Sequence, residues 1–146
     1  MRPRLLGLAL ACAATTSVVL APSAAAELRS KRAFISDTNG ARADRDIRSY
    51  QVARDLAQIA QRWANWMAQH QSMRHNPYLT SQVQGWQSVG ENVGRGPNEA
   101  NIQRMFMGDT YHRDNILSRD FTQVGIGTAR DAHGILYVDE VFRHPS

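Results

Sequence analysis

Hydrophobic residues recur at helical spacing in one long stretch of the chain. Between Val52 and Met67 the apolar side chains return every three or four positions, and arginine, glutamine and asparagine occupy the positions between them. This pattern predicts an amphipathic helix that begins near Val52 and ends near His70. Its apolar face consists of Val52, Leu56, Ile59, Ala60, Trp63 and Met67.

Two further helices are predicted from weaker patterns. The first ordered element begins at Phe34 and runs as a helix to about Arg45, whereas the polar residues 27–33 before it are expected to be loose. A short amphipathic helix follows Pro97, a residue well suited to a first helical turn, and ends at Gly108.

The last third of the chain changes from helical spacing to strand-like alternation. Val124, Ile126 and Thr128 alternate with two glycines, which predicts a strand with one face open to close approach by another element. Residues 135–142 form a second strand that is apolar on both faces apart from Asp139 and Glu140. A sheet covered on both sides fits this composition. Helices first and strands later predict an α+β fold.

The N-terminus has the features of a secretory signal peptide. Arg2 and Arg4 precede a largely apolar run from Leu5 to Leu20, and three alanines end at Ala26. This layout predicts export and cleavage after Ala26. The alternative, a retained membrane helix, needs about 20 apolar residues and is less well matched.

Cysteine content and charge restrict the chemistry of the mature chain. The single cysteine, Cys12, lies inside the predicted signal peptide, so a chain beginning at Glu27 has neither a disulfide nor a thiol. Cleavage also removes two arginines, which leaves 15 basic residues against 13 acidic ones. The basic residues are scattered and do not form an aromatic and basic stripe, so nucleic acid is not predicted as a partner.

Candidate chemistry is concentrated in a few polar residues with apolar or turn-like surroundings. Glu91 lies in the glycine-bracketed run Gly90–Gly94. His112 follows Asp109 by three residues, a spacing that puts both on the same side of a helical turn. His75 precedes Pro77 in a turn. A buried carboxylate near an imidazole indicates either a structural hydrogen-bond network or a metal or catalytic site. Sequence reasoning from these residues leaves both interpretations open.

Five short motifs in a fixed order resemble the CAP superfamily, the cysteine-rich secretory, antigen-5 and pathogenesis-related proteins, with bacterial members most similar. They are His75-Asn76, Gly90-Glu91-Asn92-Val93-Gly94, His112-Arg113-Asp114-Asn115-Ile116-Leu117, Phe121 with Val124-Gly125-Ile126-Gly127, and Val141-Phe142. The resemblance implies that residues 34–146 form a three-layer α-β-α sandwich with a small, mainly antiparallel sheet. It also implies a central cleft lined by a tetrad of His75, Glu91, Asp109 and His112.

The resemblance implies a secreted, non-catalytic binding module as the function. We expect the protein to require no cofactor. A divalent metal such as zinc is the candidate ligand of the cleft, where His75, His112 and Glu91 would hold it. Lipid or a cell-surface ligand is the candidate partner. The alternative function is a metal-dependent hydrolase that uses the same cleft, and a third interpretation is a purely structural tetrad. Asp109 is shorter than the glutamate typical of animal and plant members, so it is less suited to act as the fourth ligand of a metal site.

The signal-peptide assignment predicts that the mature protein begins at Glu27 and accumulates outside the cell without a membrane anchor. N-terminal sequencing of the protein from culture supernatant measures this directly. A membrane-bound product that retains Leu5 to Leu20 would contradict the assignment.

Overall fold

The computed structural model describes residues 24–146, which contain five helices and four strands. In chain order these elements are α1 (Ala24–Ala43), β1 (Gln51–Val52), α2 (Arg54–His70), α3 (Leu79–Gln82), β2 (Trp86–Gly96), α4 (Glu99–Gly108), α5 (Thr110–Leu117), β3 (Gln123–Arg130) and β4 (Leu136–Pro145).

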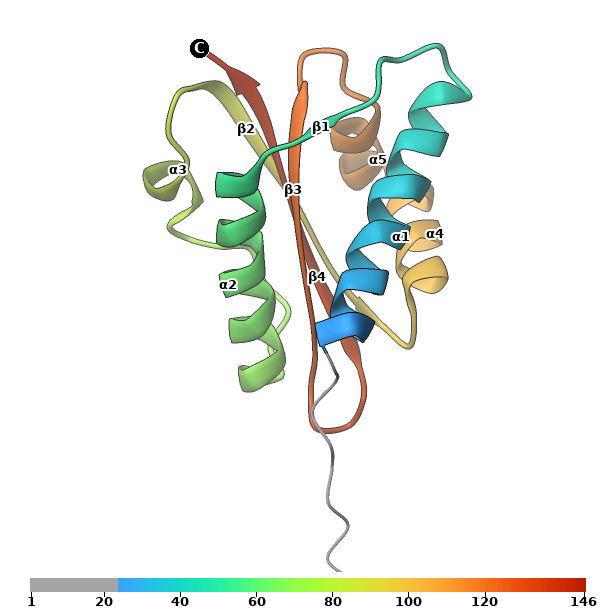
Figure 1. Cartoon of the computed structure of the whole chain (residues 1–146), viewed down its shortest axis with the longest axis vertical. Helices are drawn as coiled ribbons and strands as arrows, with labels where there is room; N and C mark the ends of the chain where they lie inside the picture. The colour runs from blue at the N-terminus through green and yellow to red at the C-terminus, as the bar shows by residue number, and fades with distance from the viewer. Residues whose placement is uncertain (1–23) are drawn as a thin grey trace, which may run out of the picture.

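The strands form one sheet in the order β1-β3-β4-β2. The β3–β4 and β2–β4 pairs are antiparallel, and the short β1 joins β3 in parallel. Helix α2 covers one face of the sheet, while α1, α4 and α5 cover the other (Figure 1). The predicted α+β class and the three-layer α-β-α sandwich with a mainly antiparallel sheet are confirmed.

Helix α2 lies directly on the glycines of β3. A Cβ atom added at Gly125 would come within 2.1 Å of the Leu56 carbonyl carbon, and one added at Gly127 within 2.2 Å of the Ala60 carbonyl carbon. No side chain fits in that space. The predicted role of these glycines, to let another element approach the strand closely, is confirmed.

Apolar side chains fill both spaces between the layers. On the side of α1, α4 and α5, Phe34, Ile102 and Phe106 pack with Ile126 and Phe142 from the sheet. On the side of α2, two smaller clusters form, one around Trp63 and Met67 and the other around Leu56 and Ile59. The sheet is therefore buried on both faces, as the composition of residues 135–142 predicted.

The prediction of a loose segment over residues 27–33 is wrong, because these residues belong to α1. Ser30 is buried and hydrogen-bonded to Glu99, and the hydroxyl of Thr128 donates to the Glu27 carbonyl oxygen at 3.4 Å. These tertiary contacts extend the helix beyond the apolar pattern that begins at Phe34. Most of the predicted signal peptide lies outside the described residues. No helix within residues 24–146 is long and apolar enough to cross a membrane.

The start of the long helix also differs from the prediction. Val52 belongs to β1 and is 54% exposed, so the long helix begins at Arg54 and not near Val52. The pairing of β1 with β3 holds this segment extended. The connection from Tyr78 to Gln87 contains the helical turn α3 and the start of β2.

The contact between α2 and β3 predicts a large effect of one added methyl group. Gly127→Ala should lower the free energy of unfolding by about 1–3 kcal/mol or more, because the helix backbone must move to make room. Gly40→Ala is a matched control, since Gly40 lies in α1 with no atom near its missing Cβ. It should be neutral or stabilising by roughly 0.5–1 kcal/mol. Denaturant titration of both variants measures the difference, and equal stabilities would contradict the packing.

Candidate functional site

His75 and Glu91 form the first polar pair of the site. Residues 71–78 follow α2 and carry His75 to the edge strand β2, where its Nδ1 lies 2.5 Å from the Glu91 Oε2. The Asn76 N–H also donates to Glu91, at 3.1 and 3.2 Å from its two oxygens. The Glu91 side chain is only 5% exposed, whereas that of His75 is 66% exposed. A buried carboxylate therefore holds an accessible imidazole.

Asp109 and His112 form the second pair, at the start of α5. The Asp109 carboxylate caps this helix by accepting from the His112 N–H at 3.1 Å, and it lies 2.7 Å from His112 Nδ1. These hydrogen bonds lower the pKa of the Asp109 carboxyl. The His112 ring also stacks on Phe106, with centroids 4.9 Å apart. A short aspartate is well suited to this position because it acts as a helix cap.

Two asparagines connect the pairs through the edge strand. The Asn92 amide donates to the His112 carbonyl oxygen at 3.1 Å. The Asn115 amide donates to the Asn92 side-chain oxygen at 2.9 Å and to the Glu91 carbonyl oxygen at 3.2 Å. Because neighbouring strand residues point to opposite faces, Glu91 and Asn92 reach toward opposite layers of the sandwich. The two histidines are thus held by segments that cover opposite faces of the sheet.

A second carboxyl, that of Asp139, is buried close to Glu91. Asp139 lies on β4 opposite Val93, and its oxygens accept no hydrogen bond of good geometry from any residue in the described part of the chain. Burial raises the pKa of the Asp139 carboxyl well above its ordinary value, and the charges of Glu91 and Glu140 raise it further. Burial also raises the pKa of Glu91, while the hydrogen bonds from His75 and Asn76 oppose the rise. Of the two carboxyls, that of Asp139 therefore has the more strongly raised pKa.

Glu140 is buried on the opposite face of the same strand. It accepts hydrogen bonds from the Asn92 amide at 3.1 Å and the Thr38 hydroxyl at 3.4 Å. Burial raises the pKa of Glu140 to about 7, and these two hydrogen bonds oppose the rise. No ion pair within residues 24–146 includes Glu140, and with a pKa of about 7 its carboxyl gains or loses a proton near neutral pH inside the core.

The structure arranges the four predicted residues as two pairs, His75 with Glu91 and Asp109 with His112. Residues 24–146 contain no group of three or more His, Cys, Asp and Glu placed to hold a metal ion. The three-ligand set of His75, His112 and Glu91 is not assembled, because Glu91 is occupied by His75 Nδ1 and the Asn76 N–H. These residues do not fit a zinc centre with three or four protein ligands.

Sequence reasoning did not assign a role to Asn92, Asn115, Asp139 or Glu140. A usable signal was present, because two adjacent acids interrupt a strand that is otherwise apolar on both faces. In such a strand both carboxyls must be buried, one on each face. The hydrogen-bond partners of Glu140 come from β2 and α1 and could not be inferred from spacing.

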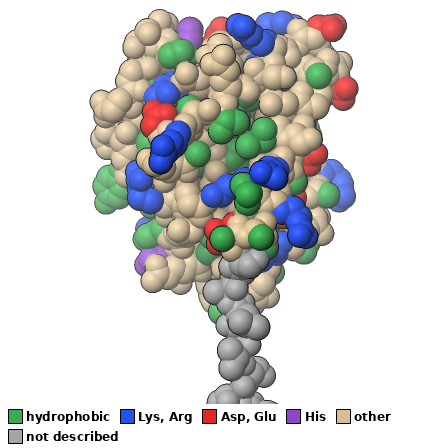
Figure 2. All heavy atoms as spheres, viewed as in Figure 1, with side chains coloured by type: hydrophobic (Ala, Val, Ile, Leu, Met, Phe, Trp, Pro, Cys, Tyr) green, Lys and Arg blue, Asp and Glu red, His purple; other side chains and the backbone are tan. Residues whose placement is uncertain are grey.

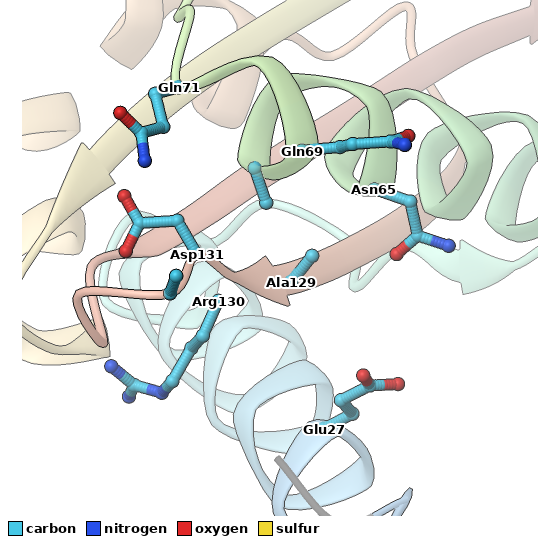
Figure 3. A pocket seen from close by; sticks show the side chains of 9 residues that line it. Glu27, Asn65, Gln69, Gln71, Ala129, Arg130 and Asp131 are labelled. Atoms are coloured by element: carbon cyan, nitrogen blue, oxygen red, sulfur yellow. The ribbon is translucent and has the colours of Figure 1, made fainter. Parts of the chain in front are cut away.

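A hollow near the end of α2 is a separate feature. This pocket of about 360 Å³ lies between α2, the β3–β4 turn and the start of α1 (Figure 3). Polar side chains and alanines line it together, with Glu27, Asn65, Gln69, Gln71 and Asp131 among the lining residues. None of the four predicted site residues lines it.

Comparison with known proteins supports the fold and the family. The model of the cysteine-rich secretory protein family (CAP) matches residues 35–139. No curated protein matches the chain.

Three solved structures illustrate the similarity of fold. An outer surface protein of Borrelia burgdorferi has a TM-score of 0.73 at 11% identity, over 81% of this chain and 94% of its own. An SCP-domain extracellular protein of Bacillus anthracis has a TM-score of 0.72 at 20% identity, over 81% of this chain and 41% of its own, so this chain spans less than half of it. NaASP2, in a crystal structure with Zn²⁺, has a TM-score of 0.63 at 11% identity, over 84% and 83% of the two chains.

The buried Glu140 predicts a pH-dependent loss of stability. Its pKa in the folded protein, about 7, is raised above the ordinary 4.5. The folded state therefore favours the neutral form of Glu140. The contribution of this group to the free energy of unfolding is complete below about pH 4.5 and is lost as the pH rises through 7. Glu140→Gln imitates the neutral form, so relative to this variant the wild type should lose about 3 kcal/mol between pH 4.5 and pH 8.

Urea titrations of both proteins across this pH range measure the effect. Asp120→Asn, a change at an exposed carboxyl, is the control and should follow the wild type. Parallel pH profiles for the wild type and Glu140→Gln would show that the Glu140 carboxyl does not titrate in this range.

Proposed function

Because the chain belongs to the cysteine-rich secretory protein family, we propose that it is a secreted binding module whose ligand contacts the imidazoles of His75 and His112. Structurally similar proteins described as extracellular or outer-surface support the proposed location. A non-catalytic role is proposed because each imidazole is hydrogen-bonded to a carboxylate, and no hydroxyl nucleophile within residues 24–146 is hydrogen-bonded to either ring.

One observation carries the proposal. Each imidazole has its Nδ1 beside a carboxylate, and its Nε2 bonds to no residue within 24–146. A neutral imidazole that donates from Nδ1 to a carboxylate keeps a lone pair on Nε2 for an external group. Both side chains are also accessible, at 66% and 31% exposure.

Exposed aromatic rings beside both histidines favour a binding role. Tyr78 is 62% exposed and lies three residues after His75, and Tyr111 is 84% exposed and precedes His112. Tyrosine provides apolar contact area with a polar tip and is enriched at interfaces. These rings fit a surface partner.

A divalent metal is the simplest ligand to test. Imidazoles with Nδ1 bonded to a carboxylate have the outer-shell arrangement of metal-ligating histidines, and NaASP2 has been crystallised with Zn²⁺. Two imidazoles are one fewer than the protein ligands of a catalytic zinc, so any binding is weak. We expect micromolar affinity at best, about −8 kcal/mol.

Hydrolysis is the second candidate and has one observation in its favour. A histidine oriented by a carboxylate can act as a general base toward water. Neither imidazole is hydrogen-bonded to a serine or threonine hydroxyl within the described chain, so no nucleophile is positioned. The binding role is therefore preferred.

The proposal predicts that zinc binding depends on the two site histidines. Calorimetric titration should give weak binding to the wild type, because only two imidazoles are available as ligands. The His75→Ala, His112→Ala double variant should lose this binding. A His133→Ala, His144→Ala variant is the matched control and should keep it. Equal zinc binding by all three proteins would overturn the metal proposal.

A further inference from the structure

Three arginines converge on a small pocket at the C-terminal end of α1. The pocket has a volume of about 210 Å³ and lies between the segment after α1 and the segment that joins α5 to β3. It is lined by Arg42, Ile47, Arg48, Ser49, Arg119 and Thr122. The lining contains no acidic residue, and none of the ion pairs in the described structure includes Arg42, Arg48 or Arg119.

Arg42 is fixed in the wall of this pocket. It is only 2% exposed, and its guanidinium donates to the carbonyl oxygens of Arg48, Ile116, Ser118 and Phe121. The guanidinium also lies 3.7 Å from the centre of the Tyr50 ring. These contacts hold the charge in one position and satisfy four of its five N–H groups. Neutral carbonyls do not cancel the charge.

Arg119 adds a second positive charge near the first. Its side chain donates to the backbone oxygens of Arg45 and Asp46, and the Asp46 carboxylate makes no ion pair with it. Burial, and secondly the charge of Arg119, lower the pKa of the Arg42 guanidinium, while Tyr50 opposes this effect. The two guanidiniums therefore repel each other, and an anion between them would remove that repulsion.

The remaining donors of the pocket are unused. The Arg48 side chain makes no hydrogen bond within residues 24–146, and neither do the hydroxyls of Ser49 and Thr122. Guanidinium and hydroxyl donors together match the oxygens of a phosphate group. The volume is below the roughly 300–1,000 Å³ of pockets for larger ligands, so one small group fits best.

We propose that this pocket binds a phosphate group, as free phosphate or as a phosphate monoester, through Arg48 and Arg119 with Arg42 as the fixed charge behind them. An extended polyanion is less well matched, because the basic side chains on the face in Figure 2 are spread out and do not form a continuous track. The site is separate from His75 and His112.

A titration with inorganic phosphate against chloride at matched ionic strength tests the proposal. Two-dimensional amide NMR of the purified protein should show saturable shifts at residues 47–49, 119 and 122.

Arg48→Gln should weaken the binding about tenfold or more, the effect of losing a charge-assisted hydrogen bond. Arg48 is the most informative position because its side chain has no intramolecular polar contact whose loss could disturb the fold. Arg119→Gln should weaken binding as well, with its melting temperature measured in parallel.

Arg62→Gln and Arg104→Gln are matched controls, since both remove one exposed arginine outside the pocket. They should bind phosphate as the wild type does, and so should the His75→Ala, His112→Ala variant, which separates this site from the proposed function. Absence of saturable binding, or equal binding by Arg48→Gln and the controls, would overturn the proposal.

Vesicles distinguish the two sources of the phosphate group. Sedimentation with phosphatidylcholine vesicles, with and without phosphatidic acid, reports whether a lipid phosphate monoester can enter the pocket. Cosedimentation that requires phosphatidic acid and Arg48 would assign the site to headgroups. Binding of inorganic phosphate without cosedimentation would assign it to free phosphate or soluble esters.

Discussion

The arrangement of this protein depends on the direct contact between the backbone of α2 and the glycine face of β3. Gly125 and Gly127 leave no space for a side chain between helix and strand. This contact sets the position of α2, and Trp63 then holds the segment after the helix by donating to the Arg74 carbonyl oxygen at 2.8 Å. His75 is the next residue, so the close packing of two apolar elements positions an imidazole at the edge strand.

The centre of the sheet carries an unusual number of acids for a buried region. Glu91 and Asp139 share one face, and Glu140 occupies the other. Burial of a charge is costly unless it is paired, and only Glu91 has an imidazole partner. Burial raises the pKa of the other two carboxyls, so both keep a proton to higher pH than an exposed acid does. The amides of Asn92 and Asn115 supply hydrogen bonds at this centre. The same amides join β2 to α5 and thereby connect the two histidine pairs.

The buried positive charge of Arg42, at the end of α1, is stabilised in a different way. Arg42 has no carboxylate partner and is held by backbone carbonyls, among them those of Ile116 and Ser118 at the end of α5. A cation suits the C-terminal end of a helix, where carbonyl groups lack partners. Arg42 therefore ties α1 to α5 and also leaves a fixed positive charge in the wall of a pocket. Structural and binding roles follow from one side chain.

A resemblance to a known family singled out His75, Glu91, Asp109 and His112 as the predicted site. The sequence by itself determined the α+β class, the long helix to His70 and the glycine face of β3. Local periodicity and glycine placement carry that information, because they depend on residues close together in the chain. Only the tertiary structure decided that these four residues form two pairs, and that residues 27–33 are helical. It alone brought Arg42 together with Arg48 and Arg119. These outcomes depend on contacts between residues up to about a hundred positions apart, such as Thr128 with Glu27, which no local pattern encodes.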